Sequence, residues 1–144
     1  MSIKELTKLS TGKDLDIEYP ISLRDKDGDE VYYEDSTGYW WKREWKDGKQ
    51  VYYENSNGRW QKREYDSDGN ETYYEDWTDY WWKYEYEDGK ETCFEDSTGY
   101  WRKHEYDDDG NETYFEESTG YWWKRDYKDG EVVYFEDSTG YWRH

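Results

Sequence analysis

The fold of this protein is decided by a stretch that runs from Gly38 to Gly48 and reads GYWWKREWKDG. Two glycines, each able to adopt the positive φ of a tight turn, enclose a segment rich in aromatic residues. Aromatic residues favour strands, and a short strand bounded by two turns indicates one arm of a β-hairpin. The same pattern recurs through the rest of the chain.

Two registers of turn residues carry the repeat. Each register steps by 20, 21, 20, 21 and 20 residues, so the true period is 41 residues, a pair of unlike hairpins. The first register consists of Gly38, Gly58, Asp79, Gly99, Gly120 and Gly140, and the second of Gly28, Gly48, Gly69, Gly89, Gly110 and Gly130. We therefore predict six hairpin repeats of 20–21 residues in residues 28–144 and an N-terminal cap in residues 1–27.

Short turns join antiparallel neighbours, so the expected fold is all-β. We predict an open antiparallel meander of about twelve strands, an elongated single-layer repeat sheet with a short N-terminal helical cap. Alternation of side chains places Trp41 and Arg43 on one face, and Trp40, Lys42 and Glu44 on the other. Neither face is purely apolar or purely polar, which favours a single layer with water on both sides over a two-layer sandwich.

The N-terminal segment differs from the repeats. Ser2 and Glu5 form a capping-box pattern, which predicts a short helix over Ile3–Leu9. Most aliphatic residues of the chain also fall here: Ile3, Leu6, Leu9, Leu15, Ile17, Ile21 and Leu23. We interpret this aliphatic segment as a cap on the first edge of the sheet. For the C-terminal edge, three alternatives stay open: a short strand, pairing in a homodimer, or cover by a partner.

The charge of the chain is large and uneven. The 144 residues carry a net charge of −18, and 23% of them are aromatic. Residues 59–120 hold 20 acidic and 7 basic residues, whereas residues 39–58 hold 3 acidic and 4 basic ones. A surface this acidic repels nucleic acid and attracts basic proteins. We therefore expect a basic protein partner, with no direct binding to nucleic acid or to a membrane.

The expected compartment is the cytoplasm. The single cysteine, Cys93, excludes an intramolecular disulfide, and the start of the chain has no apolar run suited to a signal peptide. Cys93 replaces the tyrosine found at this position in neighbouring repeats, so we interpret it as a packing substitution.

Two kinds of hairpin repeat resemble short segments of this chain. The segments EYDSDGN (Glu64–Asn70) and EYDDDGN (Glu105–Asn111) resemble the tyrosine-aspartate (YD) repeats of Rhs-type proteins. The stretch from Gly38 to Gly48 resembles the hairpin of MORN-type repeats. Aromatic, acidic Asp-Gly-Asn-Glu repeats are also similar to those of small acidic repeat proteins of bacteria and their phages. The resemblance implies a hairpin-repeat sheet and a phage or mobile-element context.

The sequence offers no constellation for catalysis. The only histidines are His104 and His144, and no Cys/His cluster could hold zinc. His104 occupies the repeat position of Arg43 and Arg63, so we interpret it as a surface substitution. Carboxylates are abundant, but each is one of several equivalent repeat positions. We therefore predict a protein that is not an enzyme and needs no cofactor.

Calcium binding is a second possibility for the acidic turns. Two sets of residues fall at positions 1, 3, 5 and 12 of a calcium-loop pattern: Glu64, Asp66, Asp68 and Glu75, and Glu105, Asp107, Asp109 and Glu116. Position 8 holds Glu71 or Glu112 where an apolar residue is expected, and the flanks read as strands rather than helices. Asp, Asn and Gly are also the residues of ordinary hairpin turns, so the prediction is no metal site, with these eight as weak candidates.

Composition and repeat together favour a function in binding. The first hypothesis is a non-enzymatic acidic protein-binding module. It would be a phage-type inhibitor, similar to DNA mimics, of a basic or nucleic-acid-binding host defence protein. Two alternatives stay open: the charge serves only solubility, or the module binds carbohydrate or cell wall, because glycine-aromatic repeats also resemble choline- and glucan-binding modules. We expect residues 59–120 to form the docking surface, with candidate residues Trp81, Trp82, Tyr100, Trp101, Asp66, Asp68, Asp107, Asp108 and Asp109.

Overall fold

The computed structural model describes residues 2–11 and 16–144, so Leu15 lies outside the described residues. One helix, α1 (Ile3–Thr11), precedes thirteen strands. They are β1 (Ile21–Arg24), β2 (Glu30–Glu34), β3 (Trp40–Lys46), β4 (Lys49–Asn55), β5 (Trp60–Tyr65), β6 (Glu71–Asp76), β7 (Trp81–Glu87), β8 (Lys90–Asp96), β9 (Trp101–Tyr106), β10 (Glu112–Glu117), β11 (Trp122–Lys128), β12 (Glu131–Asp137) and β13 (Trp142–Arg143).

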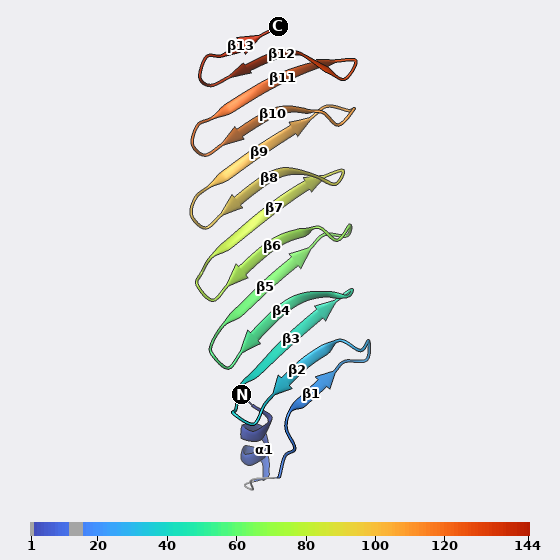
Figure 1. Cartoon of the computed structure of the whole chain (residues 1–144), viewed down its shortest axis with the longest axis vertical. Helices are drawn as coiled ribbons and strands as arrows, with labels where there is room; N and C mark the ends of the chain where they lie inside the picture. Colours follow the sequence, from blue (N-terminus) through green and yellow to red (C-terminus); the bar gives the residue numbers. More distant parts are fainter. Residues whose placement is uncertain (1, 12–15) are drawn as a thin grey trace. The chain divides into compact units, whose positions relative to one another are not determined.

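The strands pair in sequence order from β1 to β13, as an open antiparallel meander (Figure 1). The predicted fold class is therefore confirmed, with one strand more than the expected twelve. The additional strand is β1, which lies within the residues predicted as the N-terminal cap and pairs with β2.

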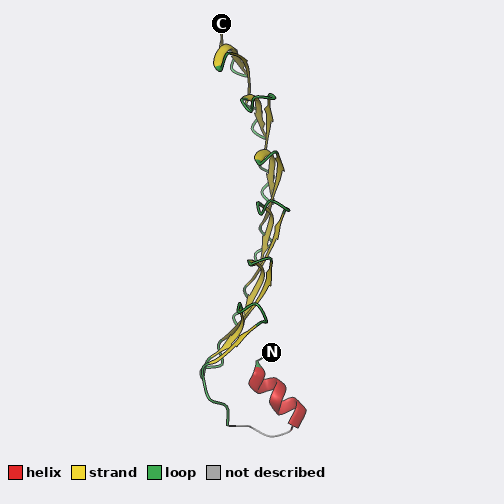
Figure 2. Cartoon of the chain, turned by 90° about the vertical axis from the view of Figure 1, so that its right-hand side faces the viewer, coloured by secondary structure: helices red, strands yellow, loops and turns green. Residues whose placement is uncertain are grey.

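Contacts divide the chain into two units. The first unit comprises Met1–Glu64 and Glu75–Thr78, and the second comprises Tyr65–Tyr74 and Asp79–His144. The first unit contains α1, β1–β4 and all of β5 except Tyr65, the second contains β7–β13, and the residues of β6 are shared. Seen edge-on in Figure 2, the strands of each unit lie in one layer.

Two kinds of turn explain the 41-residue period. In the first kind, two residues with positive φ, such as Asp47 (51°) and Gly48 (72°), form a tight hairpin of type I′. In the second kind, Asp107 and Asn111 close a three-residue turn through a 2.9 Å bond from the Asp107 N–H to the Asn111 carbonyl. The two kinds alternate in the turns that follow β1, β3, β5, β7, β9 and β11, so the lengths of successive hairpin turns differ by one residue.

One face of the sheet, which we call the lysine face, carries tryptophan, lysine and glutamate in ladders. For Lys42, Lys83, Lys103 and Lys124 the ammonium lies over the indole two residues before it, as Lys42 does over Trp40 at 5.1 Å and Lys83 over Trp81 at 5.2 Å. Lys42, Lys83 and Lys124 also pair with a glutamate of the next strand, as Lys42 Nζ does with Glu54 Oε1 at 3.3 Å, whereas Lys62 pairs with Glu64 of its own strand. Trp40 and Lys42 therefore share one face, as the alternation of side chains predicts.

The opposite face, which we call the arginine face, carries the aromatic core. Phe94 and Trp123 are each only 9% exposed. Guanidinium groups cover the rings: Arg125 lies 3.9 Å from the Trp123 centroid and Arg102 lies 4.8 Å from that of Phe94. The sheet thus shields its aromatic rings with its own arginine side chains, which bury apolar surface along their planar groups.

Helix α1 begins with the predicted capping box. The Ser2 N–H donates to Glu5 Oε2 at 2.9 Å, and the Glu5 N–H donates to Ser2 Oγ at 3.2 Å. The helix extends to Thr11, two residues beyond the predicted end. The expectation that aliphatic side chains cover the sheet edge fails for Leu6 and Leu9, which are 52% and 74% exposed. The helix is instead attached by polar contacts at its amino end.

Candidate functional site

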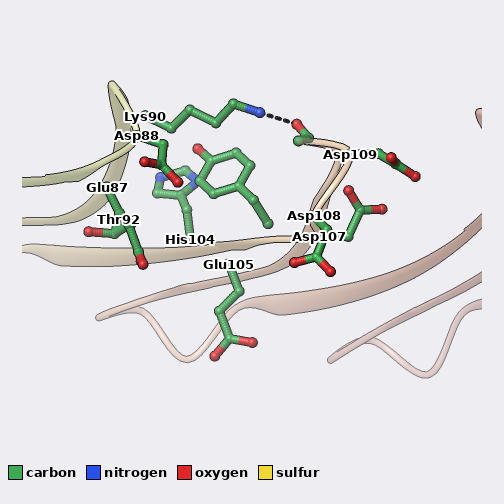
Figure 3. A pocket seen from close by; sticks show the side chains of 11 residues that line it. Glu87, Asp88, Lys90, Thr92, His104, Glu105, Asp107, Asp108 and Asp109 are labelled. Atoms are coloured by element: carbon green, nitrogen blue, oxygen red, sulfur yellow. Dashed lines mark hydrogen bonds between the residues drawn. The ribbon is translucent and has the colours of Figure 1, made fainter.

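A group of acidic side chains lies at the ends of two neighbouring hairpins of the second unit. The turns β7–β8 and β9–β10 border a recess of about 730 Å³ (Figure 3). Its lining residues are Glu87, Asp88, Lys90, Thr92, His104, Glu105, Tyr106, Asp107, Asp108, Asp109 and Gly110. Six of these are carboxylic acids and one is a lysine, so the recess is strongly negative. We call this group the acidic recess.

The backbone of the turn fixes part of this charge. Asp107 Oδ1 accepts the Asn111 N–H at 2.8 Å, and the Asn111 side-chain amide donates to the same carboxylate. These bonds, that of the Asn111 side chain first, lower the pKa of Asp107. Asp66 and Asn70 repeat the arrangement at the β5–β6 turn. Asp107 and Asp66 therefore hold turns together, whereas the side chains of Asp108, Asp109 and Asp68 are exposed to solvent.

Lys90 is held against the protein. Its ammonium donates to the Gly110 carbonyl oxygen and lies 4.8 Å from the centroid of the Tyr106 ring. Figure 3 shows the Lys90 side chain reaching across the recess toward the second turn. The Tyr106 hydroxyl in turn donates to the Glu91 carbonyl at 3.0 Å. One lysine against six carboxylic acids leaves the recess net negative.

At the recess, charged side chains of β8, β9 and β10 form a network that the sequence did not predict. Arg102 donates to both carboxylate oxygens of Glu91, at 2.6 and 2.9 Å, and this pairing raises the pKa of Arg102. His104 Nδ1 contacts Glu112, and its Nε2 lies 3.6 Å from Glu91 Oε1. The His104 side chain is only 16% exposed, so its interpretation as a surface substitution was wrong.

A sequence signal for this network does exist. The glutamates Glu91 and Glu112 recur 21 residues apart near the start of their strands, and the first unit has Gln50 at the position of Glu91 and Glu30 at that of Glu112. The network forms because β9 lies between β8 and β10, so that its side chains reach the glutamates of both neighbouring strands.

The structure does not gather the predicted aromatic anchors beside the acidic turns. Trp101 begins β9, and Asp107 follows its last residue, so six residues or about 20 Å of strand separate them. The anchors also divide between faces. Trp81 and Trp101 lie under Lys83 and Lys103 on the lysine face. Trp82 and Tyr100 contact Tyr84 and Phe94 on the arginine face.

The weak calcium candidates do not converge either. Glu116 lies inside β10 and accepts a hydrogen bond from Tyr114, whereas Asp107 and Asp109 lie in the preceding turn. A strand segment of five residues, about 17 Å, separates Asn111 from Glu116. Glu64 is paired with Lys62 at 3.6 Å. Among the residues that the structure describes, no three Asp, Glu, His or Cys side chains form a group that could hold a metal ion.

The described residues include no helix of the length and apolar character that a membrane span needs. No family model matches the chain, and no curated protein sequence matches it.

Two solved structures are similar in fold. The crystal structure of TcdB2-TccC3-Cdc42 matches 80% of this chain with a TM-score of 0.52 and 15% sequence identity. The crystal structure of TcdB2-TccC3-TEV matches the same share with a TM-score of 0.50, again at 15% identity. In both cases this chain spans only 7% of the larger chain. At this identity the likeness shows the fold alone, a repeat sheet of antiparallel hairpins.

Proposed function

We propose that the protein is a non-enzymatic, acidic protein-binding module that docks a basic partner on the acidic turns of its second unit. The observation that carries the proposal is the acidic recess, which six carboxylic acids of two neighbouring hairpins line together with a single lysine that is already bonded to Gly110. Carboxylates gathered at strand ends project a negative field that steers cationic groups toward them.

The pairing of the remaining cations supports this proposal. Lys83 and Lys124 on the lysine face pair with Glu95 and Glu136, and Arg102 pairs with Glu91. The cations of the second unit are thus largely engaged on the faces of the strands, away from the turns. These cations therefore do not neutralise the negative electrostatic field of the exposed Asp108 and Asp109 carboxylates. This favours docking at the strand ends over docking on either face.

A narrower form of the proposal concerns identity and target. The YD-like segments Glu64–Asn70 and Glu105–Asn111 form the three-residue turns of the second unit, as expected for a hairpin-repeat protein of that kind. With a net charge of −18 on 144 residues, the chain is similar in size and charge to phage-type inhibitors that mimic DNA. The proposed target is a basic or nucleic-acid-binding defence protein, which would have to release DNA when this protein binds.

The experiment is affinity capture from a host lysate, followed by mass spectrometry, with three forms of the full chain. The acidic variant carries Asp88→Asn, Asp108→Asn and Asp109→Asn. Asparagine tolerates the positive φ at position 88, so the type I′ turn is preserved. The control variant carries Asp16→Asn, Glu18→Gln and Asp27→Asn, which remove the same charge from exposed positions of the first unit.

A basic protein that the wild type and the control retain, and that the acidic variant loses, supports the proposal. Equal capture by all three forms contradicts it, because the acidity of the recess would then serve solubility alone. Displacement of the captured protein by duplex DNA tests the narrower form.

A second candidate function, carbohydrate binding, is favoured by a row of tyrosines on the arginine face. Tyr121 and Tyr141 follow equivalent turns and are 36% and 56% exposed. Each ring is tilted by 57–58° against the phenylalanine of its own hairpin, Phe115 or Phe135, so the rings share one orientation. Such rings can stack on sugars. Retention on an insoluble glycan that Tyr121→Ala with Tyr141→Ala abolishes would favour this function over the first.

A further inference from the structure

Among the described residues of the first unit, one carboxylate is buried, and it anchors α1. Glu34 on β2 is 1% exposed. Its Oε2 accepts the Ile3 N–H at 2.8 Å and the Tyr32 hydroxyl at 2.7 Å, and its Oε1 accepts the Tyr19 hydroxyl at 3.4 Å. The helix thus presents its amino end, where the helix dipole is positive, to a carboxylate.

The equivalent glutamates of later hairpins show what this position normally binds. Glu54 and Glu136 accept a tyrosine hydroxyl on Oε2, as Glu34 does, at 3.3 and 2.8 Å. On Oε1, however, they pair with a lysine ammonium of the preceding strand, at 3.3 and 3.8 Å. Opposite Glu34 the preceding strand carries Ile21, which has no charge. The amino end of α1 therefore compensates the carboxylate that a lysine compensates elsewhere.

The described contacts between the amino end of α1 and the sheet are hydrogen bonds. This end bonds to Glu34 and, through a 3.1 Å contact of the Ile3 N–H, to the Tyr32 hydroxyl. Leu6 and Leu9 face solvent, so apolar packing of these leucines does not hold the helix down. A helix of nine residues is marginal when isolated, and it depends on its docking site to stay folded.

From these contacts we infer that Glu34, Tyr32 and Tyr19 form a binding site for a primary ammonium group, and that α1 is a detachable cap that occupies this site in cis. When α1 leaves, the Glu34 carboxylate is free to bind a lysine side chain, as Glu54 and Glu136 do. The inference goes beyond the proposed function, because it concerns the first unit and does not involve the acidic recess. An ammonium group and the helix amino end then compete for one carboxylate.

The test is amide hydrogen exchange of the full chain, read separately for α1 and for β3–β5. Ile21→Lys places an ammonium opposite Glu34, in the register that Lys42 has with Glu54. We expect α1 exchange to rise about tenfold or more, since a hydrogen bond to a charged group is lost, while β3–β5 stay protected. Ile21→Gln is the control, because it loses the same apolar side chain without supplying a charge.

Glu34→Gln is the second variant, and Glu54→Gln is its matched control in the next hairpin. Glu34→Gln should release α1 and Glu54→Gln should not. If Glu34→Gln also unfolds β3–β5, Tyr32→Phe replaces it, because it removes one hydroxyl and leaves the carboxylate. Protection of α1 that is the same in Ile21→Lys and Ile21→Gln overturns the ammonium site. Protection of α1 that survives both Glu34→Gln and Tyr32→Phe overturns the detachable cap.

Discussion

At the scale of single residues, Cys93 interrupts a row of tyrosines on the lysine face. Tyr52, Tyr114 and Tyr134 each donate a hydroxyl to the glutamate two residues on. At position 93 the hydroxyl is missing, and Glu95 is 48% exposed, against 33% for Glu54. Burial raises the pKa of the Cys93 thiol, which argues for a packing role rather than reactivity.

Cys93→Tyr should therefore stabilise the protein. The ring restores a cross-strand aromatic contact and the hydroxyl a bond to Glu95, together worth about 1 kcal/mol in the free energy of unfolding. Urea titration measures the change, and Cys93→Phe, which restores the ring alone, separates the two contributions. A decrease in stability for Cys93→Tyr would mean that the neighbouring side chains leave no room for a tyrosine ring at position 93.

Asp79 is the other residue that departs from the repeat, because it holds a φ of 63° where the other members of its register are glycines. Asp79→Gly should stabilise the protein by about 0.5–1 kcal/mol through release of this conformational cost. The reciprocal change, Gly99→Asp in the equivalent turn, should destabilise by a similar amount, since a side chain there meets no atom within 4 Å. Thermal unfolding of both variants decides the matter, and equal melting temperatures would contradict the argument.

At the scale of elements, the turns before β3, β9 and β13 depend on an ionised aspartate. Asp35, Asp96 and Asp137 each accept a threonine hydroxyl and backbone N–H groups, the hydroxyl bond being the largest cause of their lowered pKa. A group with a lowered folded pKa stabilises the fold above its unfolded pKa of about 3.8, and this stability is lost as pH falls through the folded pKa.

We therefore expect stability to be constant above about pH 5 and to fall progressively below pH 4. The measurement belongs in about 1 M salt, where the Debye length is near 3 Å, because relief of the net negative charge on acidification acts in the opposite direction. Replacing the three aspartates by asparagine, which Asn55 shows to be compatible with this turn, should flatten the profile. If stability falls at low pH in that variant as it does in the wild type, titratable groups other than these three aspartates cause the fall.

Strands and turns were predictable because each depends on neighbours in sequence. The glycine registers placed the hairpins, and period-two alternation assigned Trp40 and Lys42 to the face that they occupy. The acidic recess was predictable only in part. Asp107–Asp109 are neighbours in one turn, so the sequence shows that their charges lie together. The anchor Trp101 is close to them in sequence only, since the length of β9 separates it from the turn. Glu34 and His104 were missed because their partners, Ile3 and Glu91, reach them through tertiary contacts.

At the scale of the whole molecule, the net charge of −18 is divided unequally between stretches of sequence. Residues 64–120 hold 20 acidic and 4 basic residues, whereas residues 39–63 hold 3 acidic and 7 basic ones. A partner steered by the field should therefore meet the turns of the second unit first.

The same acidic turns should fold without calcium. The carboxylates of Asp66 and Asp107 already accept N–H groups of their own turns, so a cation is not needed to hold these turns together. We expect the melting temperature to be unchanged by a chelator or by millimolar calcium. A clear drop on adding EDTA would show that the two turns bind calcium.

The acidic recess is the proposed docking surface, and the association rate constant with the captured partner measures its contribution to docking. Stopped-flow mixing should show association slowed severalfold in low salt for the variant with Asp88→Asn, Asp108→Asn and Asp109→Asn, and the difference should vanish in about 1 M salt, where exposed charges are screened. The control with Asp16→Asn, Glu18→Gln and Asp27→Asn should associate like the wild type. Equal association rate constants for all three proteins at low salt would contradict the account.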